Sequence, residues 1–490
     1  MDEKQRFKKN LLFYPLGTVG RDMTYCLVTS FLLTYIMFTR NLTTSQLAAV
    51  TAIMVFARVF DALNDPIMGN IIESTRSRWG KFKPWLLIGV LSTSFVVYFA
   101  FSSKLQGWSF IIFFGIIYIL YSITYTMSDI SYWGMVPALS SDADARNTLT
   151  SRATLFAGIG SVLASILIPV LTTGKNAIGG SATTAYSFIA LAIGIIAPVF
   201  VMFTLLGVQE NRAEQATPPT KVSMKKIVGT ITGNDQLMWM CLIFLFEEVS
   251  NMLIPGGIGA TYLYFEFGYD GGLYSTFTTV GMAATAVLMI FYPNISRKIN
   301  RKPLMKIMMT VSVIGYALML ISGLALPAGI KFPVIVVGYM CGNFGNYCFY
   351  LIMMISIMNT VEYNEYRFGT RDEGIITSLR PFLTKMASAF VVLITSLIYM
   401  ILGVANYTNQ ISDFENQASA GTVDEATKLS GITAVISNVT TKERLGLLLC
   451  MSIIPCALMY ISYKLYIKNY KLDEDEYDRI CQELGKAKIN

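Results

Sequence analysis

One arginine and two aspartates stand in the middle of a long apolar stretch, where charged side chains are costly. Residues 58–69 read RVFDALNDPIMG, within an apolar run from about residue 47 to 72. At ~100° per residue, Arg58, Asp61 and Asp65 fall on one face of a helix. Each charge at mid-bilayer costs roughly 2.5–3.5 kcal/mol, so this face must meet protein or a water-filled cavity. One arginine cannot neutralise two carboxylates, which points to a bound cation. A structural ion pair between helices is the alternative.

The composition indicates an all-α polytopic membrane protein. The chain has 490 residues, of which 54% are hydrophobic and 14% charged, and soluble domains usually carry ~25% charged residues. Strand alternation is absent. The net charge of +7 is attributed to loop topology, so no nucleic-acid partner is expected. The seven cysteines lack CxxC pairing and there is no histidine, which excludes a histidine relay or a cysteine zinc framework. The N-terminus leads into a full-length span, and we expect no cleavable signal peptide.

About twelve apolar runs reach the ~20 residues that cross a bilayer. The first six lie at roughly 11–38, 47–74, 85–103, 108–138, 152–173 and 184–208, and the others at roughly 236–267, 272–293, 303–327, 331–360, 373–404 and 443–468. Two sets of six suggest two six-helix bundles related by an internal repeat. The predicted parts are an N-terminal bundle at 1–208, a cytoplasmic linker at 209–235, a C-terminal bundle at 236–468 and a cytoplasmic tail at 469–490.

Basic residues crowd the N-terminus, the loops after spans two and eight, the central linker and the tail. By the positive-inside rule these segments are cytoplasmic, so we expect a multi-pass protein of the cytoplasmic (inner) membrane with both termini inside. The polar stretch at 405–442 is expected to be a solvated excursion on the outer side. The tail is expected to form a short amphipathic helix, and a partner site there is the alternative.

Several further charges fall inside the predicted spans: Arg21, Asp22, Asp129, Glu247, Glu248, Glu362 and Lys385. In the first half they recur on spans one, two and four, as a polar cavity inside a bundle requires. Tyr125 and Trp133 stand four residues before and after Asp129, so all three share a face. A carboxylate accepts hydrogen bonds from sugar hydroxyls, and aromatic rings cover the apolar face of a sugar. Packing is the alternative for the two aromatics. For Glu247 and Glu248, a pair near a helix end and a functional role both stay open.

The chain resembles the glycoside–pentoside–hexuronide cation symporters, the melibiose permease family of the major facilitator superfamily. The signature is carried by RVFDALNDPIMGNIIESTRSRWGKFKPW, whose end also resembles the superfamily motif between spans two and three. Weaker or shorter matches are LGTVGRD on span one, YTMSDISYWGMVPAL on span four, SRKINRKP after span eight, and VEYNEYRFGTRDEG with LTKMASAF near spans ten and eleven. The resemblance runs from residue 11 to about 400 and, through the tail, nearly to the end.

The resemblance implies a role for each matching residue. The cation ligands would be Asp61, Asp65, Asn64 and Thr126, with Arg58 balancing charge when the cation leaves. The residues at the sugar would be Asp22, Asp129, Arg21, Tyr125, Trp133 and Lys385. One departure weakens any assignment of melibiose as the substrate. Where the melibiose permease has a sugar-contacting arginine, this chain has Thr154, and Arg152 lies ~200° away around the helix.

These residues predict a secondary active transporter that couples a sugar or glycoside to a monovalent cation by alternating access, with no enzyme activity and no organic cofactor. Hard oxygen ligands favour sodium, with lithium or protons as substitutes. We expect a monomer in the lipid bilayer. The alternatives are a proton-coupled symporter, a lipid or drug facilitator, and an intramembrane enzyme that binds magnesium at its D-x-x-x-D motif.

The loop after span two is expected to gate the cytoplasmic side. Glu73 would pair with its basic residues, Arg76, Arg78, Lys81 and Lys83, and hold the outward-facing carrier closed inside. The alternative is that these charges only fix topology.

Overall fold

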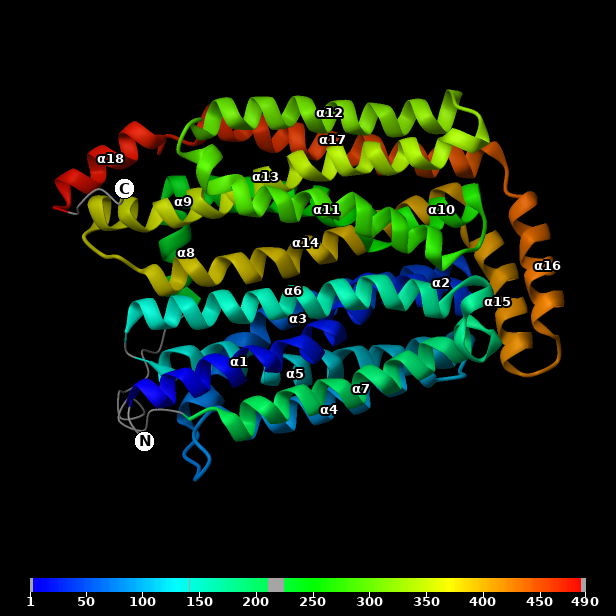
Figure 1. The fold of residues 1–490 in the computed structure, drawn as a ribbon, viewed down its shortest axis with the longest axis horizontal. Helices are drawn as coiled ribbons and strands as arrows, with labels where there is room; N and C mark the ends of the chain where they lie inside the picture. Colours follow the sequence, from blue (N-terminus) through cyan, green and yellow to red (C-terminus); the bar gives the residue numbers. More distant parts are fainter. Residues whose placement is uncertain (1–2, 141, 210–223, 486–490) are drawn as a thin grey trace. The chain divides into compact units, whose positions relative to one another are not determined.

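The computed structural model describes residues 3–140, 142–209 and 224–485, and within them all regular structure is helical (Figure 1). In this described part of the chain, 12 helical segments are long and apolar enough to cross a membrane. The predicted all-α, twelve-span architecture is therefore confirmed. Residues 210–223 of the predicted linker lie outside the described residues, and its last part, Met224–Gly233, forms helix α8.

The chain divides into two compact units. Unit 1 comprises the described parts of Met1–Lys221, Leu263–Ser275 and Tyr399–Val439. Its helices are α1 (Glu3–Cys26), α2 (Leu32–Thr39), α3 (Thr44–Ser74), α4 (Lys83–Ser102), α5 (Gly107–Leu139), α6 (Ala143–Thr172), α7 (Ala182–Gly207), α15 (Ala405–Ser419) and α16 (Glu425–Ser437). Unit 2 comprises the described parts of Val222–Tyr262, Thr276–Ile398 and Thr440–Asn490. Its helices are α8, α9 (Asp235–Leu253), α12 (Arg301–Ala325), α13 (Ala328–Phe368), α17 (Thr441–Asn469) and α18 (Glu474–Glu483). Three more helices, α10 (Gly259–Phe267), α11 (Gly271–Ser296) and α14 (Glu373–Leu402), have residues in both units.

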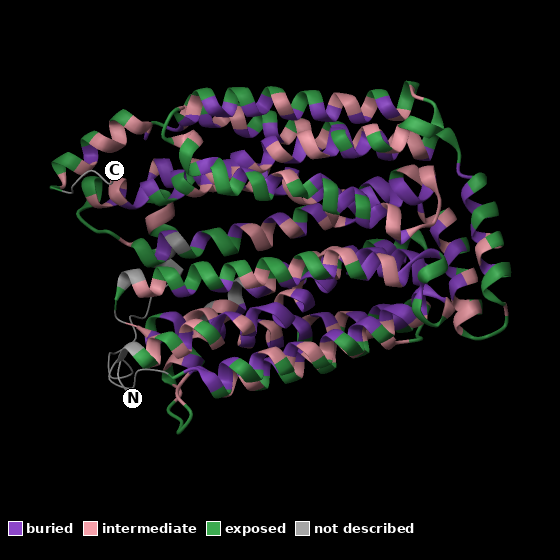
Figure 2. Ribbon diagram, viewed as in Figure 1, coloured by how far each residue is buried: buried purple, intermediate pink, exposed green. Residues whose placement is uncertain are grey.

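Buried and exposed residues alternate around the spans, as Figure 2 shows. On α5, Phe110 and Phe114 are buried, whereas Ile112 and Ile116 are exposed although both are apolar. An apolar side chain on the outer face of a span is expected in a bilayer, because lipid rather than water covers it. The polar side chains of α5, such as Ser122 and Thr126, lie on its buried face.

Span one and span seven are both interrupted by a π-helical turn. In the first half the turn covers Leu27–Phe31, between α1 and α2. In the second half it covers Ile254–Ile258, between α9 and α10, and there Gly257 has a φ of 131°. This backbone conformation is accessible to glycine and strained for other residues. Such turns inside helices are frequently found at functional sites.

The stretch at 405–442, expected to be a solvated excursion, forms α15 and α16, and most of its side chains are exposed or partly exposed. Glu415 on α15 and Lys428 on α16 are fully buried, with their carboxylate oxygen and Nζ 3.7 Å apart. Lys428 also donates to the carbonyl of Gly180 at 2.7 Å, and Glu415 accepts from the amide of Ala182 at 2.6 Å. Burial raises the pKa of Glu415, and the Lys428 ammonium opposes that rise. The fold tolerates the buried charges of Glu415 and Lys428 because they pair with each other and with backbone groups.

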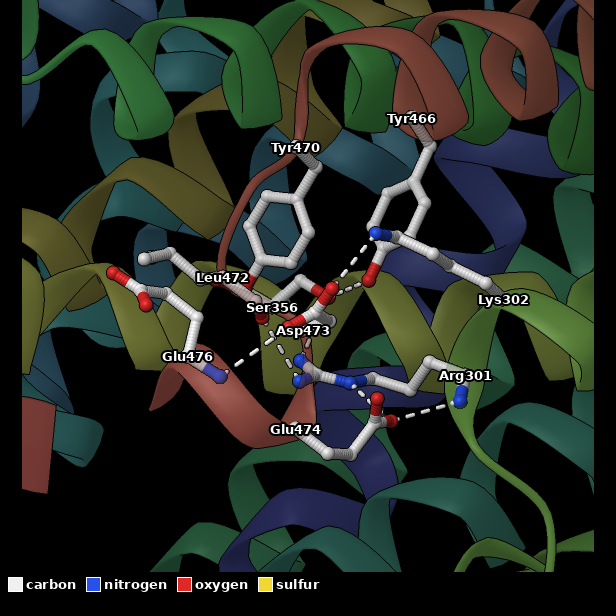
Figure 3. A network of polar contacts seen from close by, with 9 residues as sticks. All are labelled: Arg301, Lys302, Ser356, Tyr466, Tyr470, Leu472, Asp473, Glu474 and Glu476. Carbon is white, nitrogen blue, oxygen red and sulfur yellow. Dashed lines mark hydrogen bonds and ion pairs between the residues drawn. The ribbon is translucent and has the colours of Figure 1, made fainter. Parts of the chain in front are cut away.

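The expected amphipathic helix of the tail is confirmed as α18, which is tied to the start of α12 (Figure 3). One carboxylate oxygen of Glu474 accepts from the Arg301 amide at 2.8 Å and from its Nε at 2.9 Å. Lys302 donates to Asp473 at 3.0 Å, and Ile480 of α18 is buried. Burial alone would raise the pKa of Glu474, but the hydrogen bonds and charge of Arg301 outweigh it and hold that pKa below its usual range. The described part of the tail, up to residue 485, is therefore packed as part of unit 2.

Close backbone contacts around α1 give a test of the packing in unit 1. A Cβ added at Gly160 of α6 would lie 2.3 Å from the carbonyl oxygen of Val19, whereas one added at Gly158 meets nothing within 4 Å. We predict that Gly160→Val lowers the thermal unfolding midpoint of the detergent-purified protein, because overpacking costs roughly 1–3 kcal/mol. The matched variant Gly158→Val should unfold within about a degree or two of the parent, since a surface change usually costs under ~0.5 kcal/mol. Equal midpoints for the two variants would contradict this packing.

Candidate functional site

The helices α1 and α5 are joined by a pair of stacked tyrosines. The rings of Tyr14 and Tyr132 lie 4.4 Å apart. Each hydroxyl donates to the other residue's carbonyl, at 2.9 Å from Tyr14 and 2.6 Å from Tyr132. Both side chains are fully buried. This contact fixes the face of α5 that carries Asp129 against the face of α1 that carries Arg21 and Asp22.

Arg21 lies between the two carboxylates that the sequence assigns to the substrate. Its guanidinium is 3.4 Å from the carboxylate of Asp22 and 3.2 Å from that of Asp129. The exposed fraction of the side chain is 3% for Arg21, 18% for Asp22 and 33% for Asp129. The arginine is thus buried behind two accessible carboxylates. One guanidinium faces two carboxyl groups, so the cluster has a formal charge of −1 when both carboxyls are ionised.

Aromatic rings surround this cluster. The Arg21 guanidinium lies 4.5 Å from the ring centre of Tyr132 and 5.3 Å from that of Trp133. Tyr125 stacks on Tyr25 of α1, with ring centres 5.6 Å apart. The arrangement brings hydrogen-bond acceptors and flat apolar surfaces together, as recognition of a polyhydroxylated ring requires.

The second carboxylate group lies on α3 and contacts α5 at two positions that are one helical turn apart. Arg58 pairs with Asp61 at 3.5 Å, and the hydroxyl of Ser122 donates to the other oxygen of Asp61. The hydroxyl of Thr126 donates to Asp65 at 3.2 Å. Asp61 to Asp65 is one turn of α3, and Ser122 to Thr126 is one turn of α5. These contacts place oxygen atoms of two carboxylates and two hydroxyls along one seam.

Asn64, the remaining predicted cation ligand, is buried on α3. Its amide nitrogen has no hydrogen-bond partner among the residues that the structure describes. Which end of the amide is oxygen is assigned from the hydrogen-bond network, and exchanging the two ends costs no space. Asn64 is thus a neutral side chain next to Asp65 in sequence, with its amide nitrogen unpaired among the described residues.

Sequence reasoning missed Ser122 and Tyr25. The signal for Ser122 was its place four residues before Thr126, which puts both hydroxyls on one face of α5. Tyr25 lies four residues after Arg21, so the same spacing argument could have identified it.

The other predicted residues of spans one, two and four are brought together in unit 1. Lys385 is not among them, since it lies on α14 in unit 2. Arg152 and Thr154 both have exposed side chains on α6.

The loop between α3 and α4 contains one of the predicted charge pairs. Lys81 lies 3.4 Å from Glu73. Arg76 donates to the carbonyls of Glu73 and Thr75. Lys83 was expected to join the charge pairs, but its Nζ donates to the carbonyls of Leu205 and Val208, at 2.8 and 2.7 Å. Lysine at a helix C-terminus satisfies carbonyls that lack a partner within the helix. The gating role of Glu73, Arg76, Arg78 and Lys81 stays a prediction.

Residues 13–474 match the model of a family described as MFS/sugar transport protein. The chain belongs to this family. The resemblance to the glycoside–pentoside–hexuronide symporters is thereby confirmed, together with the major facilitator fold.

The curated relatives of this family member are named as carriers. It is 28% identical to the lactose permease of Leuconostoc lactis over 79% of this chain and 62% of that permease, so it spans less than two thirds of that relative's length. It is 24% identical to the raffinose carrier protein of Pediococcus pentosaceus, over 99% of this chain and 73% of the carrier. It is 24% identical to the glucuronide carrier protein homolog of Escherichia coli (strain K12), over 98% of this chain and 96% of that protein. A family of permeases and carriers excludes the intramembrane-enzyme alternative.

Solved structures share the fold. A D-xylose-proton symporter has a TM-score of 0.60 at 13% identity, over 89% of this chain and 99% of the symporter. A bacterial homolog of the human lysosomal transporter Spinster, inward-facing and unoccupied, has a TM-score of 0.61 at 10% identity, over 95% of this chain and 98% of the homolog. At these identities the likeness concerns the fold alone.

Proposed function

We propose that this protein is a symporter of the cytoplasmic membrane that couples the inward movement of a sugar or glycoside to sodium. The observation that carries the proposal is the pair of carboxylate groups in unit 1. Each holds two aspartates and one arginine, and each is contacted by side chains of α5. With every side chain ionised, two aspartates and one arginine sum to a formal charge of −1 inside a membrane-spanning segment, where ionisable residues mark ion and substrate pathways.

The group of Arg21, Asp22 and Asp129 suits a sugar. Its two carboxylates are the more accessible members, and the aromatic rings beside them offer surfaces for the apolar faces of a pyranose. The relatives named above carry lactose, raffinose and glucuronide in their names, which favours a glycoside over a lipid or drug.

The group of Asp61 and Asp65 suits a small cation. Two carboxylates, the hydroxyls of Ser122 and Thr126 and the amide of Asn64 are all hard oxygen donors, which alkali cations prefer. A carrier coupled only to protons needs one titrating carboxylate and no neutral ligands. The neutral ligands therefore favour sodium over the proton-coupled alternative.

The helix α5 links the two groups. Thr126 contacts Asp65, and Asp129 follows it by three residues, which on a helix separates neighbouring side chains by about 5–6 Å between Cβ atoms. A cation that orders α3 against α5 would therefore also order the sugar-facing turn of α5. When both ligands favour the same occluded state, each raises the affinity for the other. Rocking of the two bundles would then expose that state to each side in turn, with both termini in the cytoplasm and the α3–α4 loop as the inner gate.

For the sugar group we predict that Asp22→Asn or Asp129→Asn abolishes sugar binding and leaves folding and membrane insertion intact. An amide replaces part of the acceptor capacity of a carboxylate with donors. Binding should be measured calorimetrically on purified protein with lactose, raffinose and a glucuronide, and circular dichroism should report the fold. Affinities within a factor of two of the parent in both variants would refute the assignment.

For the cation group we predict that sodium stimulates sugar uptake into proteoliposomes at fixed pH and that Asp61→Cys and Asp65→Cys abolish the stimulation. Thr126→Val should raise the sodium concentration for half-stimulation roughly tenfold, since one lost ligand contact of ~1.4 kcal/mol changes affinity by that factor. Thr124→Val is the matched control, because its hydroxyl bonds the carbonyl of Leu120 within α5.

Stimulation of the parent by a pH gradient but never by sodium would show that the sodium assignment is wrong. Full sodium stimulation in both aspartate variants would show that the site itself is misplaced.

A further inference from the structure

Two adjacent carboxyl groups, Glu247 and Glu248, lie inside α9 of unit 2 and have no part in the proposed function. Their exposed fractions are 0% and 4%. Glu248 accepts a hydrogen bond from Thr384 of α14 at 3.0 Å and interacts with the guanidinium of Arg380. Both carboxyl oxygens of Glu247, in contrast, have no partner among the described residues. The two neighbouring glutamates therefore differ in hydrogen bonding, since Glu248 has a partner and Glu247 has none among the described residues.

The surroundings of Glu247 are polar but contain no compensating cation among the described groups that interact with it. Ser250 lies one helical turn further along α9, accepts from the amide of Asn346 on α13 at 3.1 Å and donates to the carbonyl of Pro455 on α17 at 2.8 Å. The other end of that amide, Asn346 Oδ1, is a buried acceptor without a partner in the described part of the chain. An acceptor therefore lies unused on the helix that packs against α9.

The titratable groups near the pair come from every helix around it. They are Tyr316 on α12, Tyr347 and Tyr350 on α13, Arg380 on α14, and Cys456 on α17, which interacts with Tyr316. On α8, Lys226 is paired with Asp372, and on α14 Lys385 follows Thr384. The charged neighbour that interacts with Glu247 is Glu248, which has the same sign when ionised. The positive group, Arg380, is directed to Glu248 and to the hydroxyl of Tyr350 at 2.6 Å.

These contacts decide which form of Glu247 the fold tolerates. Moving an ionised carboxylate out of water costs several kcal/mol unless a counter-ion and hydrogen bonds compensate it. Glu247 has neither, and its charged neighbour opposes ionisation. The neutral acid avoids the cost of the charge and provides an O–H donor, which an ionised carboxylate lacks.

The backbone supplies a second, independent observation. The π-helical turn at Ile254–Ile258 begins six residues after Glu248, and the one at Leu27–Phe31 begins five residues after Asp22. Interrupted helices in corresponding positions of two repeated halves indicate binding sites near the middle of the membrane. Glu248 and Arg21 each stand six residues before the turn of their own span, so the glutamate pair lies one residue earlier in span seven than Arg21 and Asp22 do in span one.

We propose that Glu247 is a proton-binding site of unit 2. In the conformation described here the carboxyl is protonated. When the transport cycle admits water to α9, its O–H bond breaks, the proton passes to water, and the carboxylate stays behind hydrated. The site is distinct from the cation group at Asp61 and Asp65, and its occupancy makes the conformational equilibrium depend on pH whichever cation drives transport.

Infrared spectroscopy of the purified full-length protein tests this directly. A protonated carboxyl gives a C=O stretching band that an ionised one lacks and that shifts in heavy water. We expect the parent to show such a band at neutral pH, Glu247→Gln to lose part of it, and the matched Glu248→Gln to keep that part. If the glutamine variant does not fold, Glu247→Asp should move the same component to a new position. A parent without the band, or a band that is the same in Glu247→Gln and the parent, would overturn the proposal.

The pH dependence of stability gives a second readout. If the folded protein holds a proton that the unfolded chain releases, its stability falls as pH rises through the neutral and alkaline range. The thermal unfolding midpoint of the parent should therefore decline over that range, and Glu247→Gln should decline less steeply. Equal slopes for Glu247→Gln and the parent would contradict a bound proton at this position.

Discussion

The packing of α5 against α1 and α3 is the constraint on which the rest of unit 1 depends, because it buries charge. Arg21 and Arg58 are each close to fully buried, and each is held by aspartates on its own or a neighbouring helix. Breaking a buried pair such as Arg58 with Asp61 costs roughly 3–5 kcal/mol, whereas Arg21 keeps one carboxylate when either Asp22 or Asp129 is neutralised. The stacked pair of Tyr14 and Tyr132 keeps the helices close enough for these contacts. The fold and the proposed chemistry therefore rest on the same side chains.

In both carboxylate groups the acidic side chains outnumber the basic ones. Each contains two aspartates and one arginine, so neither is neutral by itself. A fully compensated ion pair would stabilise the bundle and give a ligand nothing to neutralise. In the proposed function, a bound cation would offset the remaining charge in one group, and a polyhydroxylated ligand would satisfy acceptors in the other.

Much of the architecture was predictable, because span length and charge depletion are properties of local sequence. The predicted span at 236–267 corresponds to a helical segment at Asp235–Phe267, and the predicted span at 108–138 corresponds to Gly107–Leu139. Within the site, the face shared by Arg58, Asp61 and Asp65 follows from helical spacing alone. The predicted domain boundaries stay a prediction, since part of the linker lies outside the described residues.

The features that were not predicted depend on partners from elsewhere in the chain. Within the largely exposed stretch at 405–442, Glu415 and Lys428 are buried, and their ion pair depends on the packing of α15 against α16, which the local sequence does not show. Lys83 has the charge of a gate residue, but the end of α7 lies beside it and binds its ammonium. The isolation of Glu247 is likewise invisible in sequence, because its neighbour Glu248 has a partner and Glu247 has none among the described residues.

In the proposed mechanism, sugar and cation stabilise the same state of the carrier through α5. Calorimetric titration measures this coupling, with the sugar that binds best titrated at low and at saturating sodium, and sodium titrated with and without that sugar. We expect sodium to raise sugar affinity and sugar to raise sodium affinity by the same factor, typically 5–150-fold for coupled sites. A sugar affinity that is independent of sodium at constant ionic strength and pH would show that the two ligands are not coupled.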